Sequence, residues 1–199
     1  DASAAGVFVA ASAGNSGPGN QVAHPSPWIT TVAASTHDRQ FIADLTLGGG
    51  GIFTGASFNV SALPSAAMVL SSDVGLPTAN PVEVNLCYLN TLDPAKVAGK
   101  IVVCDRGVNA RVDKSAEVKR AGGVGMVLIN PTLSNLVADI HSVPSVHLPD
   151  TAYTAVRAYV AAANPTGSIG ARRQDPSSVA PVMASFSSRG PNKADSHVM

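Results

Sequence analysis

The stretch that decides how this chain folds is VFVAASAGNSGP, residues 7–18. It opens with the apolar run Val7-Phe8-Val9 and ends in small residues, an asparagine and a glycine-proline turn. A continuous apolar run bounded by turn residues predicts a strand that is buried on both faces and ends at Asn15. The carboxamide of an asparagine in that position can point into a cleft and stabilise an oxyanion. The alternative is an asparagine that only tolerates an unusual backbone angle in a turn.

The composition of the chain argues against several classes of protein. Of its 199 residues 45% are hydrophobic and 13% charged, so we expect a folded chain. The 13 basic residues balance 13 acidic ones, which gives no electrostatic reason to expect nucleic acid or a membrane surface as a partner. No apolar stretch approaches the roughly 18 residues of a membrane span. Because the chain starts at Asp1 with no signal peptide, we expect an excised segment of a longer protein.

Strand and helix signals alternate along the rest of the chain. WITTVAAS, residues 28–35, predicts a second strand, and residues 41–58 predict a β-hairpin whose turn holds four consecutive glycines. Further strands are expected at 67–70, 101–104, 124–129, 145–148 and 166–172. We also expect a helical turn capped by Asp93, a helix at 113–121 capped by Asp113 and a helix at 150–163. In the last helix Tyr153, Val156 and Val160 share one face, so we expect them in the core.

The two cysteines, Cys87 and Cys104, leave two interpretations open. They could be free buried thiols of a cytosolic protein. A disulfide is also geometrically reasonable, because both lie in extended-looking segments separated by a proline-containing turn. Such a bridge would add about 3 kcal/mol of stability and would indicate an oxidising location. The single glycosylation sequon, Asn59-Val60-Ser61, is compatible with secretion.

Three motif blocks carry a family resemblance: AASAGNSGP (10–18), HPSPWITTVAAS (24–35) and ASFSSRGPN (184–192). In this order they resemble the subtilisin-like serine proteases, or subtilases. The resemblance implies an α/β fold in which the first two blocks contribute parallel strands to the sheet that carries the active site. It also implies that Asn15 is the oxyanion-hole side chain. Ser12, Ala13 and Gly14 would then form one wall of the cleft that binds the substrate residue before the scissile bond.

The middle of the chain resembles the protease-associated (PA) domain, a β-rich α+β barrel or sandwich flanked by helices that is inserted in many subtilases. The resemblance rests on GKIVVCDRG (99–107), AGGVGMVLIN (121–130) and VPSVHLP (143–149). We therefore expect a catalytic-domain fragment at 1–38, an insert at 39–180 with a PA core at about 60–172, and re-entry into the catalytic domain at 181–199. GKIVVCDRG is closest to plant-type subtilases and their bacterial relatives, in which a pair such as Cys87 and Cys104 is typically bridged. The final KADSHVM departs from the family pattern, and we interpret it as a truncated or artificially added end.

The catalytic triad of the family is missing from the sequence. None of the five histidines is followed by Gly-Thr, and neither Gly-Thr-Ser nor Asp-Ser/Thr-Gly occurs. We therefore expect this chain to be inactive by itself and its parent to be a secreted serine endopeptidase that hydrolyses peptide bonds of peptide or protein substrates. No cofactor is predicted, although the resemblance leaves a structural calcium possible in the intact enzyme. His141 and His147 would lie roughly 20 Å apart if extended, too far to share a metal ion.

The PA-like module has two possible uses. By resemblance it would tune substrate access, bind protein or mediate self-association, and exposed strand edges also invite self-association. The competing hypothesis is a non-catalytic PA-type interaction module, as in sorting receptors and ubiquitin ligases, but AGNSGP and SFSSRGP at its borders favour the protease. Within the module we expect Asp105 and Arg106 to form a surface ion pair or a binding rim. Ser187 and Ser188 are expected to pack beside the active-site sheet.

Overall fold

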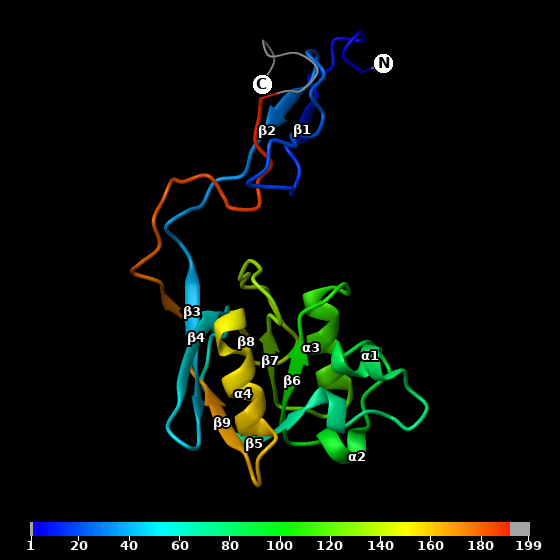
Figure 1. Ribbon diagram of the computed structural model, residues 1–199, viewed down its shortest axis with the longest axis vertical. Coiled ribbons are helices and arrows are strands. Elements are labelled where there is room, and N and C mark those ends of the chain that lie inside the picture. Colours follow the sequence, from blue (N-terminus) through cyan, green and yellow to red (C-terminus); the bar gives the residue numbers. More distant parts are fainter. Residues whose placement is uncertain (1, 192–199) are drawn as a thin grey trace. The chain divides into compact units, whose positions relative to one another are not determined.

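The structure, a computed structural model that describes residues 2–191, contains two compact units (Figure 1). The first unit combines Asp1–Arg39 with Pro176–Met199, and the second is the continuous stretch Gln40–Asp175. The predicted KADSHVM end lies outside the described residues. Among residues 2–191, no helix has the length and apolar character needed to cross a bilayer.

In its described residues, the first unit holds one pair of parallel strands, β1 (Ala10–Ser12) and β2 (Thr30–Val32). Their pairing confirms that the first two motif blocks run side by side in the same direction. The position predicted for the first strand is wrong, because β1 begins at Ala10. Val7 and Phe8 are 55% and 78% exposed, since nothing among the described residues of this unit covers them. A wider parallel sheet around this pair stays a prediction.

The second unit is built on eight strands in the order β10-β3-β4-β8-β7-β6-β5-β9. Their bounds are β3 (Phe41–Leu47), β4 (Ile52–Ala56), β5 (Leu63–Leu70), β6 (Ile101–Asp105), β7 (Gly125–Ile129), β8 (Ser145–Leu148), β9 (Thr166–Ile169) and β10 (Arg173–Gln174). Strand β9 pairs with both β5 and β3, so the sheet returns on itself and is barrel-like (Figure 1). The predicted β-rich barrel is therefore present in this unit.

Strands β3 and β4 form the predicted antiparallel hairpin around the four glycines. Gly50 has a φ of +93°, a conformation that favours glycine. A Cβ at Gly48 would lie only 2.2 Å from Thr166 Oγ1, so the turn must also be free of side chains where it meets β9. The glycine run serves backbone geometry and close packing.

The parallel strands β6 and β7 separate two hydrophobic cores. Ile101, Val103, Val127 and Ile129 belong to one core, and Val102, Cys104, Met126 and Leu128 belong to the other. All eight side chains are fully buried. This two-sided burial explains why the sequence shows continuous apolar runs here in place of an apolar and polar alternation.

Helices cover both cores. The core shared by Val102 and Cys104 is closed by α1 (Pro81–Asn85), α2 (Pro94–Val97) and α3 (Arg111–Arg120), which lie beside β6 in Figure 1. The other core receives Val156 and Val160 from α4 (Tyr153–Val160), as predicted, with Tyr153 packed against it. Short 3-10 turns lie at Ser71–Asp73 and Asp150–Ala152.

Two predicted helix boundaries need correction. Asp93 caps α2 as expected, accepting a hydrogen bond from the Ala95 N–H at 2.9 Å. Asp113 is not a cap, because α3 begins at Arg111 and Asp113 lies in its first turn, where its charge complements the helix dipole. The helix predicted at 150–163 is shorter than expected, since its first residues form a 3-10 turn and α4 ends at Val160.

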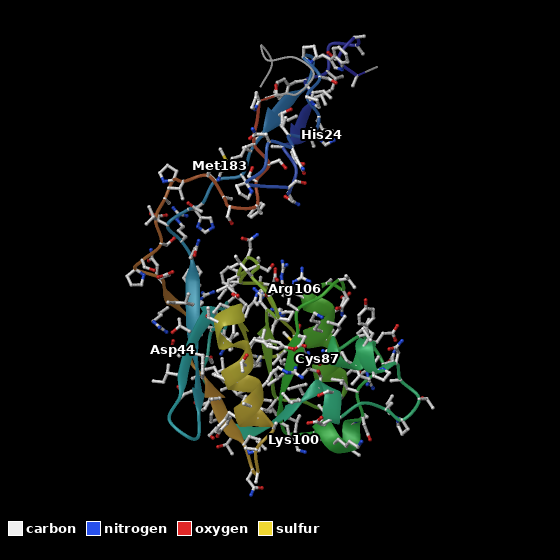
Figure 2. The ribbon with its side chains drawn as sticks, in the orientation of Figure 1. His24, Asp44, Cys87, Lys100, Arg106 and Met183 are labelled. Atoms are coloured by element: carbon white, nitrogen blue, oxygen red, sulfur yellow. A yellow bond between two sulfur atoms is a disulfide. The ribbon has the colours of Figure 1, made fainter. Side chains whose placement is uncertain are left out.

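A disulfide joins Cys87, just after α1, to Cys104 on β6 (Figure 2). Their Cα atoms are 5.8 Å apart, and both residues are fully buried in the core that α1, α2 and α3 close. The bridged interpretation of the two cysteines is thereby confirmed.

Candidate functional site

Hydrogen bonds in the first unit bring the first and last motif blocks together. Gly17 N–H donates to Phe186 O at 2.9 Å, and Ser188 N–H donates to Gly14 O at 3.0 Å. In addition, the Ser16 N–H donates to Ser188 Oγ at 2.8 Å, across 172 positions of sequence. AGNSGP is therefore held against SFSSRGP on both sides of Asn15.

The close contact of the two blocks explains the glycines of AGNSGP. Gly14 has a φ of +92°, and a Cβ there would lie 3.0 Å from Ser188 Oγ. At Gly17 a Cβ would lie 2.2 Å from Ser187 O, which is backbone and cannot move aside without shifting the chain. Side chains larger than hydrogen are thus excluded at both positions.

The segment before Asn15 is fixed by the second block. Ala13 is buried, its N–H donates to Val32 O at 2.9 Å, and its carbonyl accepts from the Ala23 N–H at 2.8 Å. The preceding carbonyl, that of Ser12, is 3.0 Å from His24 Nδ1. The predicted cleft-wall residues therefore form a short, firmly bonded extended segment.

Asn15 itself is exposed, and its side chain forms no hydrogen bond with the described residues. Its neighbours are fixed, because Gly14 O and Ser16 N–H both bond to Ser188. The structure thus presents two free carboxamide N–H donors on a well-anchored loop. No hydroxyl, imidazole and carboxylate arranged as a catalytic triad accompanies them in the described part of the unit.

Ser187 and Ser188 of SFSSRGP are buried and hydrogen-bonded, in keeping with the predicted packing role. Ser187 Oγ accepts from the Ala34 N–H at 3.1 Å, just beyond β2. Ser188 Oγ accepts from Ser16, as described above. A bridge between Ser35 and Met183 adds a further link between the second and third blocks.

Comparison with known proteins agrees with this arrangement. Residues 65–156 match the family model of the PA domain. The chain is 45% identical to subtilisin-like protease SBT1.7 of Arabidopsis thaliana over 203 residues, which cover 98% of this chain and 26% of that protein. It is 43% identical to SBT1.6 of the same plant over 202 residues, covering 96% of this chain and 25% of that protein. Over nearly its whole length, the chain therefore matches a segment of the subtilisin-like proteases that includes the PA domain.

The chain spans about a quarter of the length of the curated relatives it matches. Among solved structures, the psychrophilic subtilisin-like protease Apa1 from Pseudoalteromonas sp. AS-11 is 17% identical, with a TM-score of 0.47. That likeness covers 86% of this chain and 49% of Apa1, and it is too distant to inform on function.

The second unit, Gln40–Asp175, contains the residues that match the PA domain and is called the PA unit below. It holds a buried charge that the sequence analysis placed on the surface. Asp105, at the end of β6, is 3% exposed and pairs with Arg157 Nη1 at 2.8 Å. Its carboxylate also accepts from Tyr153 OH at 2.9 Å and Asn85 Nδ2 at 2.7 Å. The predicted surface pair with Arg106 is therefore wrong, because Asp105 points inward and ties β6 to α4.

Helix α3 contributes two further buried charges, Lys114 and Glu117, that sequence reasoning missed. Lys114 Nζ donates to Leu86 O at 2.6 Å and Asn109 Oδ1 at 2.5 Å, and burial lowers its pKa to about 8. Both residues lie on the helix face of Val118, at the i, i+3 and i+4 spacing of a buried face. That spacing was the available signal.

Glu117 organises the loop that follows the disulfide cysteine. Its carboxylate accepts backbone N–H bonds from Asn90, Thr91 and Leu92 at 2.7 to 3.0 Å and pairs with Arg120. Burial by itself raises the pKa of Glu117, but these hydrogen bonds outweigh it and hold the pKa below its ordinary value. The negative charge of Glu117 therefore serves to hold this loop in place.

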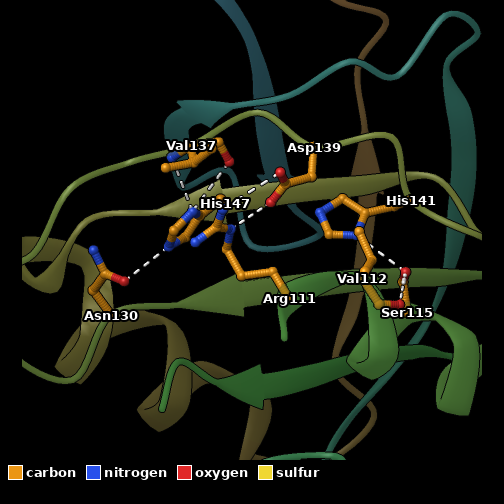
Figure 3. Close-up of polar contacts among 8 residues, drawn as sticks. All are labelled: Arg111, Val112, Ser115, Asn130, Val137, Asp139, His141 and His147. Atoms are coloured by element: carbon orange, nitrogen blue, oxygen red, sulfur yellow. Dashed lines mark hydrogen bonds and ion pairs between the residues drawn. The ribbon is translucent and has the colours of Figure 1, made fainter. Parts of the chain in front are cut away.

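A network of polar side chains fixes the loop between β7 and β8 (Figure 3). Arg111 pairs with Asp139, and His141 Nδ1 lies 3.0 Å from Ser115 Oγ. His147 Nε2 is 2.8 Å from Asn130 Oδ1, and its Nδ1 accepts the Val137 N–H at 3.2 Å. Burial lowers the pKa of both histidines, that of His147 to about 4. Both imidazole rings therefore take part in these contacts in their uncharged form.

No metal centre emerges from this network. Within residues 2–191, no group of three or more His, Cys, Asp or Glu side chains is arranged to hold a metal ion. The two histidines bond to different partners, Ser115 and Asn130.

Proposed function

We propose that the parent of this chain is a secreted serine endopeptidase in which Asn15 stabilises the oxyanion formed during acyl transfer. The observation that carries the proposal is the free carboxamide of Asn15 on a loop anchored at both neighbours by Ser188. The family of the chain supports the reaction class.

The chemistry follows from where negative charge develops. Attack of a serine hydroxyl on a peptide carbonyl places negative charge on the carbonyl oxygen, and a preorganised N–H donor stabilises that charge more than it stabilises the neutral substrate. Asn15 would donate one such bond, and a backbone N–H of the nucleophile segment would donate the second. Ser12, Ala13 and Gly14 would line the cleft beside it.

The catalytic groups themselves lie outside this sequence. An oxyanion donor without a nucleophile and a base cannot carry out acyl transfer, so we propose that the 199-residue chain alone is inactive. The same proposal identifies the substrates of the parent as peptides or proteins.

For the PA unit we propose a role in substrate access, protein binding or self-association. Large apolar side chains stand exposed on its loops, among them Val108 and Leu133, each 88% exposed. Exposed apolar side chains of this size favour contact with another protein surface. The disulfide supports an oxidising, extracellular location for the parent.

The test is the replacement Asn15→Ala in the full-length parent protease. We expect kcat to fall by about 10²–10³ with little change in KM, a magnitude taken from the equivalent replacement in subtilisin, a member of this family. Asn20→Ala, at an exposed asparagine in the following loop, is the matched control and should leave kcat unchanged. Unaltered labelling of the nucleophile by a fluorophosphonate would show that the triad is intact. A full kcat in Asn15→Ala would refute the proposal.

A further inference from the structure

A groove of about 340 Å³ in the PA unit remains unassigned by the proposed function. It lies between residues 58–62, which connect β4 to β5, and residues 139–145, which lead into β8. Apolar side chains line it, and two of them, Val60 and Ile140, are 72% and 86% exposed. Such side chains leave the groove ready to accept the apolar face of a ligand.

Asn59 on the wall of this groove begins the single sequon of the chain, Asn59-Val60-Ser61. Its backbone is fixed, because its N–H donates to Ser57 Oγ at 3.0 Å and its carbonyl accepts the Arg172 N–H at 2.6 Å. Its side-chain Nδ2 donates one hydrogen bond, to Gly170 O at 3.0 Å. The residue is half-buried, on a segment outside any strand.

We infer that Asn59 carries an N-linked glycan whose innermost N-acetylglucosamine lies in this groove. A primary carboxamide has two N–H bonds, and the structure uses one of them on Gly170 O. The other N–H can be replaced by the sugar while the bond to Gly170 O is kept. Glycosylation of Asn59 is therefore compatible with the folded unit as it stands.

The covalent step needs one co-reactant, an oligosaccharide linked to a lipid diphosphate. Nδ2 of Asn59 forms a bond to C1 of the first sugar, the bond from C1 to the diphosphate oxygen breaks, and Nδ2 loses one proton. The lipid diphosphate leaves with the bonding electron pair, so no oxidant or reductant is required. Transfer takes place in the compartment where the Cys87–Cys104 disulfide also forms. The inference does not depend on peptidase activity.

The seated sugar would cover apolar surface. Its ring has an apolar face, and Val60 and Ile140 are the exposed side chains available to contact it. Sugar hydroxyls would face solvent and the polar groups of the wall, such as Ser142. A bulky, polar chain at this point would also keep the face from associating with other apolar surfaces.

The first experiment translates the chain behind a cleavable leader in the presence of microsomes and examines the protease-protected product with and without an endoglycosidase. Ser61→Ala removes the sequon at an exposed residue whose side chain forms no hydrogen bond with the described residues, and Ser61→Thr keeps the sequon. We expect the wild-type and Ser61→Thr products to gain mobility on treatment and Ser61→Ala to be unaffected. A protected wild-type product that the endoglycosidase does not shift would overturn the inference.

The second experiment tests the seating of the sugar. The chain is secreted from a host that adds high-mannose glycans, trimmed to a single N-acetylglucosamine, and compared with Ser61→Ala by hydrogen exchange. We expect slower exchange at residues 139–143 in the trimmed protein and equal exchange at the remote glycine turn, residues 48–51. Equal exchange at 139–143 in both proteins would overturn the placement of the sugar in the groove.

Discussion

The two units of the chain achieve order in different ways. The PA unit buries Leu45, Ile101, Val127 and other apolar side chains completely, in two cores on either side of β6 and β7. The part of the first unit that the structure describes has a single two-stranded sheet with exposed faces. Its segments are joined mainly by hydrogen bonds between residues far apart in sequence.

The comparison shows that apolar burial stabilises the PA unit, whereas hydrogen bonds fix the geometry of the first unit. Apolar burial contributes about 25 cal/mol per Å², whereas a single hydrogen bond adds a net 0.5–1.5 kcal/mol or so. We therefore expect the PA unit to fold by itself and the first unit to depend on apolar partners in its parent. The hydrogen bonds of the first unit instead fix one loop, the loop of Asn15, with high geometric precision.

The largest effect is expected at the buried charge of the PA unit. Glu117→Ala would leave three backbone N–H groups and Arg120 without their acceptor, so it should lower the free energy of unfolding of this unit by about 3–5 kcal/mol. Urea denaturation of residues 40–175 provides the measurement. Glu83→Ala, at an exposed glutamate in α1, should change it by less than about 0.5 kcal/mol. Equal effects of the two replacements would contradict a structural role for Glu117.

Acidification should weaken the PA unit through His147. Burial lowers its pKa to about 4, so between about pH 6.5 and pH 4 the unfolded chain binds a proton that the folded unit excludes. The contribution of neutral His147 to the free energy of unfolding is fully present above pH 6.5. It is lost as the pH falls, and the loss reaches about 3 kcal/mol near pH 4. Urea midpoints at pH 7, 5.5 and 4 measure this, and His147→Gln should reduce the dependence. An unchanged pH dependence in the variant would assign the effect to other groups, such as His141.

A smaller and more local effect is expected in the first unit. Ser188→Ala removes the acceptor of the Ser16 N–H and should cost about 1–3 kcal/mol of local stability at the Asn15 loop. Amide hydrogen exchange at Ser16, followed by NMR, should become faster. Exchange in β6 and β7 should stay as in the wild type, and faster exchange there would show that the two units are not independent.

The smallest effect is expected at the exposed apolar run before β1. Phe8→Ala should change the unfolding free energy of the chain by less than about 0.5 kcal/mol, because the ring is already exposed. In the intact parent the same replacement should cost more if other segments cover Phe8. A large loss in the isolated chain would show that this unit has a core of its own.

The features that followed from local sequence were predicted well. The β3–β4 hairpin, the cap at Asp93 and the buried strands β6 and β7 depend on residues close together in sequence or on an uninterrupted apolar run. The pairing of Cys87 with Cys104 is confirmed as well, although the residues alone had left it open. Of the candidate site, the proximity of the outer motif blocks was expected from the family resemblance.

The features that depend on distant partners were not predictable in the same way. Asp105 bonds to Arg157, 52 positions further on, so its neighbour Arg106 was a misleading choice of partner. The closure of the sheet requires β9 to pair with both β3 and β5, which no local pattern encodes. Val7 and Phe8 read as a buried strand because their composition is apolar, whereas burial depends on what covers them.

The most direct test of the central claim is a structure of the parent protease bound to a peptide aldehyde that forms a tetrahedral adduct with the nucleophile. We predict that Nδ2 of Asn15 lies about 2.7–3.1 Å from the adduct oxygen, the range expected of an oxyanion donor. An adduct oxygen bound only by other donors, with the Asn15 side chain turned toward solvent, would contradict the role proposed for this residue.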